Sequence, residues 1–129
     1  MANTDYNVNI YREQNTGALV VGSGFGIRRS LATIAAAGTN QGTAAALTAE
    51  VNKVTGADGT KGVVIPAGLK GGEELNVFNV TAAQALNVYP PTGGTINYAA
   101  ANAAFSLAGQ KQVRILALSA TEFYTELTA

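Results

Sequence analysis

Short segments in which apolar and polar residues alternate recur along the chain, and turn residues interrupt them about every ten positions. In Asp5–Arg12, for example, Tyr6, Val8 and Ile10 fall on one face of an extended strand. A spacing of roughly 8–12 residues between turn signals is typical of β-sandwiches and barrels. We therefore predict an all-β protein, specifically a jelly-roll-like β-sandwich domain with an extended N-terminal arm.

From Leu31 onward the pattern predicts strands near 32–37, 44–55, 62–67, 73–81, 85–90, 95–98, 103–108, 112–119 and 122–127. The main alternative concerns Thr43–Lys53, because its Ala, Leu, Glu and Lys residues are good helix formers. Val51, Val54 and the Gly56 that follows favour a strand over a helix there. We expect a strand.

Residues 1–30 are too few to enclose a core, and their pattern indicates an arm or small hairpin. A turn at Gln14–Gly17 separates two short extended segments, and the glycines of Gly22–Gly26 then loosen the chain. We expect residues 1–30 to form the arm and residues 31–129 to form the β domain.

The phrase Leu-Asn-Val-aromatic occurs twice, as Leu75–Phe78 and as Leu86–Tyr89. Eleven residues is shorter than the units of solenoid repeats, which run to about 20–50 residues. We therefore expect one β-hairpin with a loop at Thr81–Gln84. Its leucines and valines would share a core face, and Phe78 and Tyr89 would lie on the other, where a second subunit could cover them. These two aromatics are the predicted oligomer interface.

The charge composition is unusual, because charged residues make up only 12% of the chain, about half the ordinary share. Eight basic and eight acidic residues leave no net charge, whereas a nucleic-acid binder needs a basic face. A near-neutral surface also favours association. The N-terminus lacks the pattern of a signal peptide, and no apolar run is long enough for a membrane helix. We predict neither a nucleic-acid nor a membrane partner.

Side chains that carry chemistry are scarce. The chain has no His and no Cys, which removes the commonest general base and the thiolate metal ligands. The only paired carboxylates, Glu73/Glu74 and Glu122/Glu126, are placed as solvated charges, since catalytic pairs must face one cleft. A site based on Ser/Lys or Tyr stays open, although no motif points to one. We predict no enzymatic activity, no cofactor and no metal.

Two glycine-rich segments resemble nucleotide loops only superficially. Gly22–Gly26 lacks the third glycine of a dinucleotide fingerprint, because Ile27 occupies that position. Gly56–Gly62 lacks the spacing of a phosphate-binding loop, and its Asp58-Gly59 pair predicts a hairpin turn. We interpret the first segment as a joint and the second as a turn.

The opening MANTDYNVNIYREQNTGALVVGSG is similar to the start of small structural proteins of tailed bacteriophages. The rest resembles a β module of phage virion proteins, through Ala32–Ile34, Ala46–Asn52, Gly62–Pro66, Leu86–Pro90, Ala100–Ala103 and Phe123–Thr125. The sequence departs from the expected glycine- and serine-rich pattern at Phe25–Ser30. The family that this resemblance indicates is the head decoration, or cement, proteins.

The resemblance implies a homotrimeric module on the outer surface of the virion capsid that bridges subunits of the major capsid protein and stabilises the shell. The arm would grip the capsid, and its candidate contact residues are Tyr6, Val8, Ile10, Tyr11, Arg12, Arg28 and Arg29. An alternative is a head-fibre or tail-fibre module that binds a host receptor or glycan through exposed aromatics such as Tyr98. A wall-degrading enzyme is the least favoured class.

Overall fold

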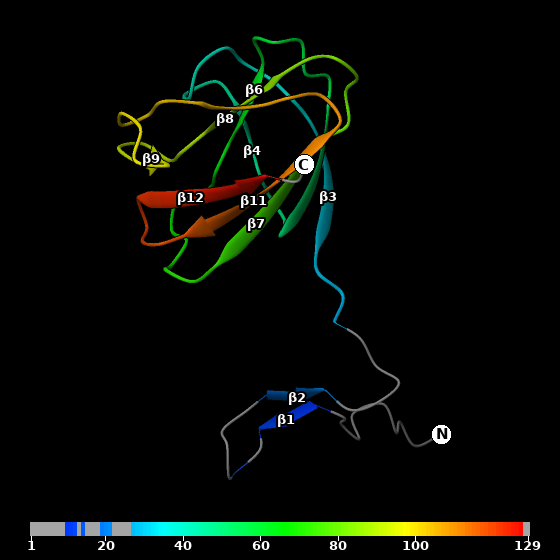
Figure 1. The fold of residues 1–129 in the computed structure, drawn as a ribbon, viewed down its shortest axis with the longest axis vertical. Helices are drawn as coiled ribbons and strands as arrows, with labels where there is room; N and C mark the ends of the chain where they lie inside the picture. The colour runs from blue at the N-terminus through cyan, green and yellow to red at the C-terminus, as the bar shows by residue number, and fades with distance from the viewer. Residues whose placement is uncertain (1–9, 13, 15–18, 22–26, 128–129) are drawn as a thin grey trace.

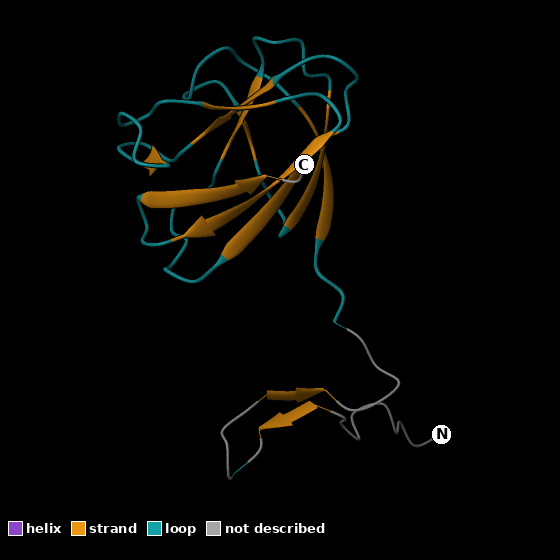
Figure 2. Ribbon diagram, in the orientation of Figure 1, coloured by secondary structure: helices purple, strands orange, loops and turns teal. Residues whose placement is uncertain are grey.

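The computed structural model describes residues 10–12, 14, 19–21 and 27–127. No helix occurs among them, so the all-β prediction is confirmed and the helical alternative for Thr43–Lys53 is wrong. The ribbon in Figure 2 accordingly shows strands and loops alone over the described part of the chain. The strands are β1 Ile10–Arg12, β2 Leu19–Val21, β3 Leu31–Ala35, β4 Ala45–Ala46, β5 Val51–Thr55, β6 Gly62–Val64, β7 Glu74–Asn79, β8 Leu86–Tyr89, β9 Thr95–Ile96, β10 Phe105–Leu107, β11 Lys111–Ala117 and β12 Glu122–Leu127.

The strands from β3 onward form two mixed sheets (Figure 1). The larger has six strands in the order β3-β5-β7-β11-β12-β9, and the smaller has four in the order β10-β8-β6-β4. From β3 to β8 each strand lies in the opposite sheet to the one before it, and strands of the same sheet pair in parallel. This part of the chain therefore winds as a flattened coil of three turns, β3–β4, β5–β6 and β7–β8.

Antiparallel strands complete both sheets beyond the last turn of the coil. In the six-stranded sheet β11 pairs antiparallel with both β7 and β12, and in the four-stranded sheet β10 pairs antiparallel with β8. A jelly roll is built from antiparallel strands, so the parallel pairing of the coil leaves the jelly-roll-like part of the prediction unconfirmed.

One apolar core lies between the two sheets. Val54, Val77 and Val113 reach it from the six-stranded sheet, and Val63 and Val88 reach it from the four-stranded sheet, all with no exposed surface. The alternation of the strands explains this arrangement, because every second side chain points inward. Burial of each of these side chains stabilises the folded state by about 1.5–3 kcal/mol relative to leaving it exposed.

The two copies of Leu-Asn-Val-aromatic do not form a hairpin, so that prediction is wrong. β7 and β8 belong to different sheets and face one another across the core. The predicted inward face is nevertheless confirmed, since Leu75, Val77, Leu86 and Val88 are all buried in the one core. The two copies of the phrase thus present the same apolar pair, Leu and Val, to the core from opposite sides.

Two strands replace the single strand predicted for 44–55, because the chain turns between β4 and β5. The buried side chain of Asn52 holds that turn: its Oδ1 accepts bonds from the amides of Thr48 (3.3 Å) and Ala49 (3.2 Å). Its Nδ2 donates to the Ala49 carbonyl at 2.6 Å. A buried amide that serves both sides of a turn compensates its own desolvation, and here it directs the chain from one sheet to the other.

β1 and β2 form a separate antiparallel pair in which Ile10 lies opposite Val21 and Arg12 opposite Leu19. Among the described residues, neither strand pairs with a strand of the two larger sheets. Figure 1 shows this hairpin apart from the body, a term we use for residues 31–127. The hairpin agrees with the sequence pattern of the arm.

Candidate functional site

The predicted capsid-contact residues of the arm are only partly within the described residues. Tyr6 and Val8 lie outside them. Ile10, Tyr11 and Arg12 form strand β1, where Tyr11 is opposite Val20 of β2. Because a two-stranded sheet leaves one side of each strand without a ladder partner, β1 and β2 each offer a row of backbone donors and acceptors.

Arg28 and Arg29 follow the hairpin in sequence, and both are exposed. Arg29 lines a cleft of about 390 Å³ together with Glu50, Glu73 and Glu74. The segment is attached to the body at the next residue, since the Ser30 carbonyl accepts a 2.9 Å bond from Val51 and its Oγ accepts one from the Glu50 amide. The arm therefore leaves the body beside a group of carboxylates.

An ion-pair network centred on Arg114 occupies the outer face of the six-stranded sheet. Its Nη2 is 2.6 Å from Oε2 of Glu126, and its Nη1 is 3.7 Å from Oε1 of Glu74. Arg114 and Glu126 are directly opposite one another on β11 and β12. All three side chains are substantially exposed, so the network contributes little stability, typically below about 1 kcal/mol per pair. One positive charge is shared between two carboxylates, so the network carries a net charge of −1.

The two aromatics predicted to form an oligomer interface lie on opposite outer faces of the body. Phe78 is half-buried on the six-stranded sheet, between Lys53 and Gln112 of the neighbouring strands. Tyr89 lies on the four-stranded sheet and is only 9% exposed. Its hydroxyl donates to the Thr39 carbonyl at 3.2 Å, so a loop of its own chain covers it. The two residues therefore do not share one surface.

Tyr98 is exposed as expected, and it lies beside a second exposed ring. The centroids of Tyr98 and Tyr124 are 5.9 Å apart with the planes at 64°, an edge-to-face contact. Both Asn97 and Tyr98 have positive φ angles, 54° and 59°. Asn97 fixes this strained turn, because its Nδ2 donates to Thr125 Oγ1 at 2.6 Å and its Oδ1 accepts from the Thr125 amide at 2.8 Å.

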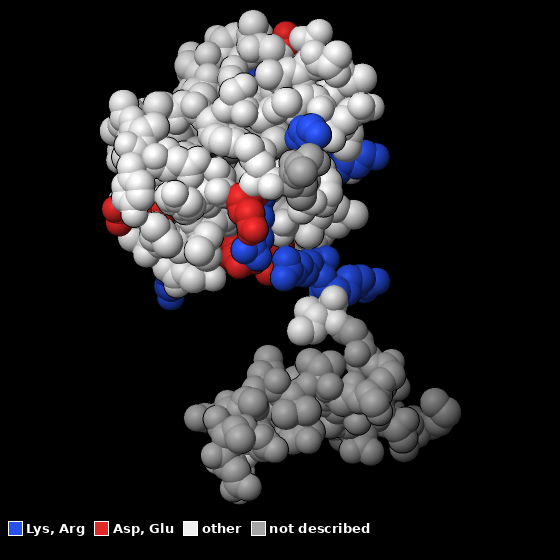
Figure 3. Space-filling view, in the orientation of Figure 1, with Lys and Arg blue, Asp and Glu red and all other residues white. Residues whose placement is uncertain are grey.

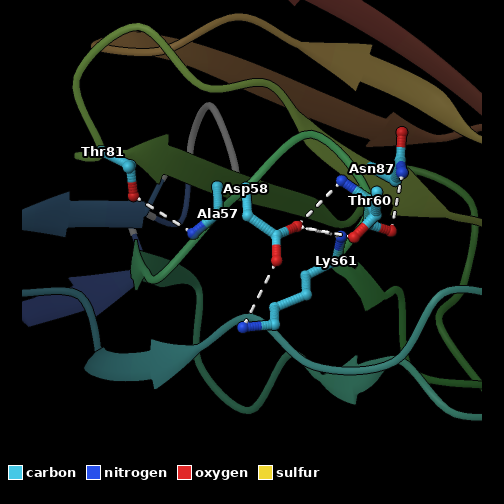
Figure 4. A network of polar contacts seen from close by, with 6 residues as sticks. All are labelled: Ala57, Asp58, Thr60, Lys61, Thr81 and Asn87. Atoms are coloured by element: carbon cyan, nitrogen blue, oxygen red, sulfur yellow. Dashed lines mark hydrogen bonds and ion pairs between the residues drawn. The ribbon is translucent and has the colours of Figure 1, made fainter.

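The turn predicted at Asp58-Gly59 is confirmed, but it does not join a hairpin, since β5 and β6 lie in different sheets. Figure 4 shows one oxygen of Asp58 accepting bonds from the Thr60 hydroxyl, the Thr60 amide and the Lys61 amide, at 2.7, 2.9 and 2.9 Å. These bonds, those from Thr60 foremost, hold the pKa of Asp58 well below its ordinary value. This site is structural, because every partner is part of the turn itself.

The same turn is fastened to the next turn of the coil. The Ala57 amide donates to Thr81 Oγ1 at 3.2 Å, and Asn87 Nδ2 donates to the Thr60 carbonyl at 3.1 Å (Figure 4). The amides of Ala57, Thr60 and Lys61 are thus occupied within the chain, which supports a structural turn rather than a phosphate-binding loop.

The charged side chains of the body are unevenly placed. None of the strands β4, β6, β8 and β10 contains a charged residue, whereas the six-stranded sheet carries both signs. Figure 3 shows a mostly uncharged surface, with acidic and basic side chains gathered near the segment that leads to the arm. The surface contains large areas that a partner could cover without desolvating a charge.

Neither a metal centre nor a membrane helix is evident in the described part of the chain. No group of three or more Cys, Asp or Glu side chains there is arranged to hold a metal ion. Within the same residues, no helix has the length and apolar content needed to cross a membrane.

No protein-family model matches the chain, and no curated protein matches it.

Sequence reasoning missed the partners of two functional candidates. Glu126 is a solvated charge as predicted, since its side chain is 69% exposed, but its 2.6 Å contact with Arg114 was not predicted. Tyr124 was not paired with Tyr98, because the two are joined only through the parallel pairing of β9 with β12. Opposite charges on adjacent predicted strands could have indicated the first contact, but no local signal indicates the second.

Proposed function

We propose that this chain is a phage capsid decoration protein, which binds the outer surface of the head and stabilises the shell by bridging subunits of the major capsid protein. The observation that carries the proposal is the arm hairpin, which pairs within itself and with neither larger sheet among the described residues. A module with its own core and a separate attachment segment suits a protein that adds to an assembled surface. The function proposed is structural, with no catalysis and no cofactor.

The arm would bind by strand addition. An extended segment that pairs with a sheet edge of the capsid gains main-chain hydrogen bonds, and side chains at alternate positions give specificity. Ile10, Tyr11 and Arg12 on β1 are suited to this role, with Tyr6 and Val8 before them in sequence. Arg28 and Arg29 would extend the contact toward the body. We expect no nucleic-acid or membrane partner.

The body would project from the capsid as a double-sheet module. We propose that it has a jelly-roll-like form and assembles as a homotrimer. Its low charge supports self-association, since apolar surface left exposed on one 13.1 kDa chain can be covered by another. Phe78 is the better interface candidate of the two predicted aromatics, because its own chain covers it only in part, whereas Tyr89 is 9% exposed.

Deletion of residues 1–30 tests the proposed attachment. Capsids lacking the protein are mixed with the full chain or with residues 31–129, and bound protein is measured by co-sedimentation and by electron microscopy. We expect the full chain to decorate the head and the truncated chain to stay in solution with an unchanged β circular dichroism spectrum. Equal decoration by both proteins would remove the arm from the mechanism, and failure of the full chain to bind would overturn the proposed function.

A second candidate function, a fibre module that binds a host receptor or glycan, is favoured by the exposed pair Tyr98 and Tyr124. A strained turn that holds an aromatic ring in solvent is typical of a preorganised binding surface. Glycan-array binding by the wild-type chain that Tyr98→Ala abolishes, with virions labelled at the tail or head fibres, would support this function. No binding by the wild-type chain would exclude the glycan form of it.

A further inference from the structure

β3 is the longest edge strand of the two larger sheets. It has five residues, whereas the other edges, β4, β9 and β10, have two or three. Short edge strands protect a sheet from unwanted pairing, and a long edge needs a charge, a proline or a bulge for that purpose. β3 reads Leu-Ala-Thr-Ile-Ala and contains no charge and no proline.

The backbone of β3 presents an open row of hydrogen-bonding groups. The Ser30 carbonyl accepts from Val51 and the Ala36 amide donates to Thr55, so the even-numbered residues face β5. Because these directions alternate along a strand, the amides and carbonyls of Leu31, Thr33 and Ala35 face away from the sheet. No described strand pairs with that side of β3, and Figure 1 shows β3 at the side of the body with no strand beyond it.

The side chains on this row are also uncovered. Leu31 is 68% exposed, and Thr33 and Ala35 are exposed as well. Ile34 packs against the core from the opposite face of the strand. The edge is thus rigidly supported from inside while its outer groups meet solvent.

We propose that β3 pairs antiparallel with β3 of a second copy of this chain, about a two-fold axis through Thr33. The sequence of the strand is complementary to its own reverse. In this register Leu31 lies opposite the small Ala35, Ala32 lies opposite Ile34, and Thr33 lies opposite itself. A large residue therefore meets a small one at each unequal pair, and cross-strand Thr–Thr pairs are favourable.

The register also satisfies the open backbone groups. Leu31, Thr33 and Ala35 all fall at hydrogen-bonded positions of an antiparallel ladder, so about six hydrogen bonds would join the two copies. The interface is isologous, because the same surface serves both partners. It is distinct from a trimer contact and does not depend on the proposed capsid function.

Five residues of edge form a small contact, at the weak end of specific interfaces. We expect a reversible dimer with a dissociation constant on the order of 0.1 mM. Sedimentation of the full chain at increasing concentration, up to about 1 mM, measures it. Thr33→Pro removes an outward amide from each copy without removing a bond to β5, a position where edge strands accept proline. Thr33→Ala is the matched control, since it keeps the amide.

Thr33→Pro is expected to weaken dimerisation about tenfold or more, because a symmetric interface loses the outward amide of both copies. Thr33→Ala keeps both amides, so it should weaken dimerisation far less.

A second pair of variants fixes the register. The chain has no Cys, so Thr33→Cys provides a single thiol beside the axis, within disulfide reach of its symmetry mate. Ala35→Cys places the two thiols about 13 Å apart.

With oxidised glutathione as the electron acceptor, Thr33→Cys should give disulfide-linked dimers and Ala35→Cys should not. The doubly substituted Leu31→Cys/Ala35→Cys chain should cross-link again, since those positions face each other. A wild-type chain that stays monomeric at 1 mM, or equal cross-linking at positions 33 and 35, would overturn the proposal. Loss of dimer in Thr33→Pro with cross-linking confined to position 33 would support it.

Discussion

The ring of Tyr89 lies against Gly62, so closely that a Cβ added to the glycine would be 2.7 Å from a ring carbon. The same Cβ would be 2.6 Å from the carbonyl oxygen of Asn87. The two residues sit on adjacent strands of the four-stranded sheet, β6 and β8. Glycine therefore makes room for the ring that the Thr39 loop covers.

The first prediction is that Gly62→Ala destabilises the body. The added Cβ clashes with both the ring and a strand carbonyl, and overpacking of this kind costs about 1–3 kcal/mol of the free energy of unfolding. Gly42→Ala is the matched control, because its Cβ would meet only the Asn40 side chain at an ordinary 3.6 Å. Urea unfolding followed by circular dichroism measures both. Equal midpoints for the two variants would show that the ring can move freely.

The second prediction concerns Asn79, which is 1% exposed and serves two connections at once. Its Nδ2 donates to the carbonyls of Gln84, Leu107 and Ala108, at 2.8, 3.1 and 3.3 Å, and its Oδ1 accepts from the Thr81 amide. Asn79→Ala removes all four bonds of this buried amide, so we expect a loss of about 2–4 kcal/mol in the free energy of unfolding.

Asn87→Ala is the comparison for Asn79→Ala, since Asn87 is less buried and its side chain makes one bond, to the Thr60 carbonyl. We expect it to cost about 1 kcal/mol or less. Calorimetric melting of both variants gives the ranking. A smaller loss for Asn79→Ala than for Asn87→Ala would contradict the assigned role of the buried amide.

The third prediction is a pH dependence from Asp58. Hydrogen bonds from Thr60 and Lys61 lower the pKa of this carboxyl in the folded chain, so the folded state favours its ionised form. Its contribution to stability is complete above the ordinary pKa of aspartate, near 4, and is lost as the pH falls below that value. Asp58→Asn cannot titrate, so its melting temperature should fall less steeply than that of the wild type between about pH 4 and pH 2. Parallel curves would be evidence against the assignment.

The fourth prediction concerns Ala83, whose φ of 58° lies in the left-handed region without a glycine. Ala83→Gly relieves this strain and should leave the free energy of unfolding unchanged or raise it by up to about 1 kcal/mol. Ala82→Gly, at the exposed neighbouring position without a positive φ, should lower it by about 0.5–1 kcal/mol. Chemical denaturation measures the free energy of unfolding of each variant relative to wild type. A loss for Ala83→Gly as large as that for Ala82→Gly would contradict the prediction.

The local pattern predicted nearly every strand of the body, because alternation and turn residues are recorded within each segment. Sheet membership was not predictable in this way. Leu75–Phe78 and Leu86–Tyr89 have the same pattern whether they pair as a hairpin or face one another across a core, since both arrangements bury the same leucines and valines. The choice depends on β6, β10 and β11, which pair with them from elsewhere in the chain.

The functional candidates differ in how far their exposure and contacts could be predicted from the sequence. The exposed positions of Arg28, Arg29 and Tyr98 followed from their place in turns and connections. The cover over Tyr89 did not, because it comes from Thr39, fifty residues earlier. Contacts between residues so far apart in sequence leave no periodic signal. For the same reason the contact between Tyr98 and Tyr124 was not predictable.

The winding of the chain gives the body two unlike ends. Beyond β7 and β8 the strands β11 and β10 pair antiparallel with the coil, so its parallel winding stops there. The first turn, β3–β4, has no such closure among the described residues. The two ends of the coil therefore differ, because antiparallel strands flank only one of them. The longest open edge of the two larger sheets, β3, therefore lies at the end of the body from which the arm extends.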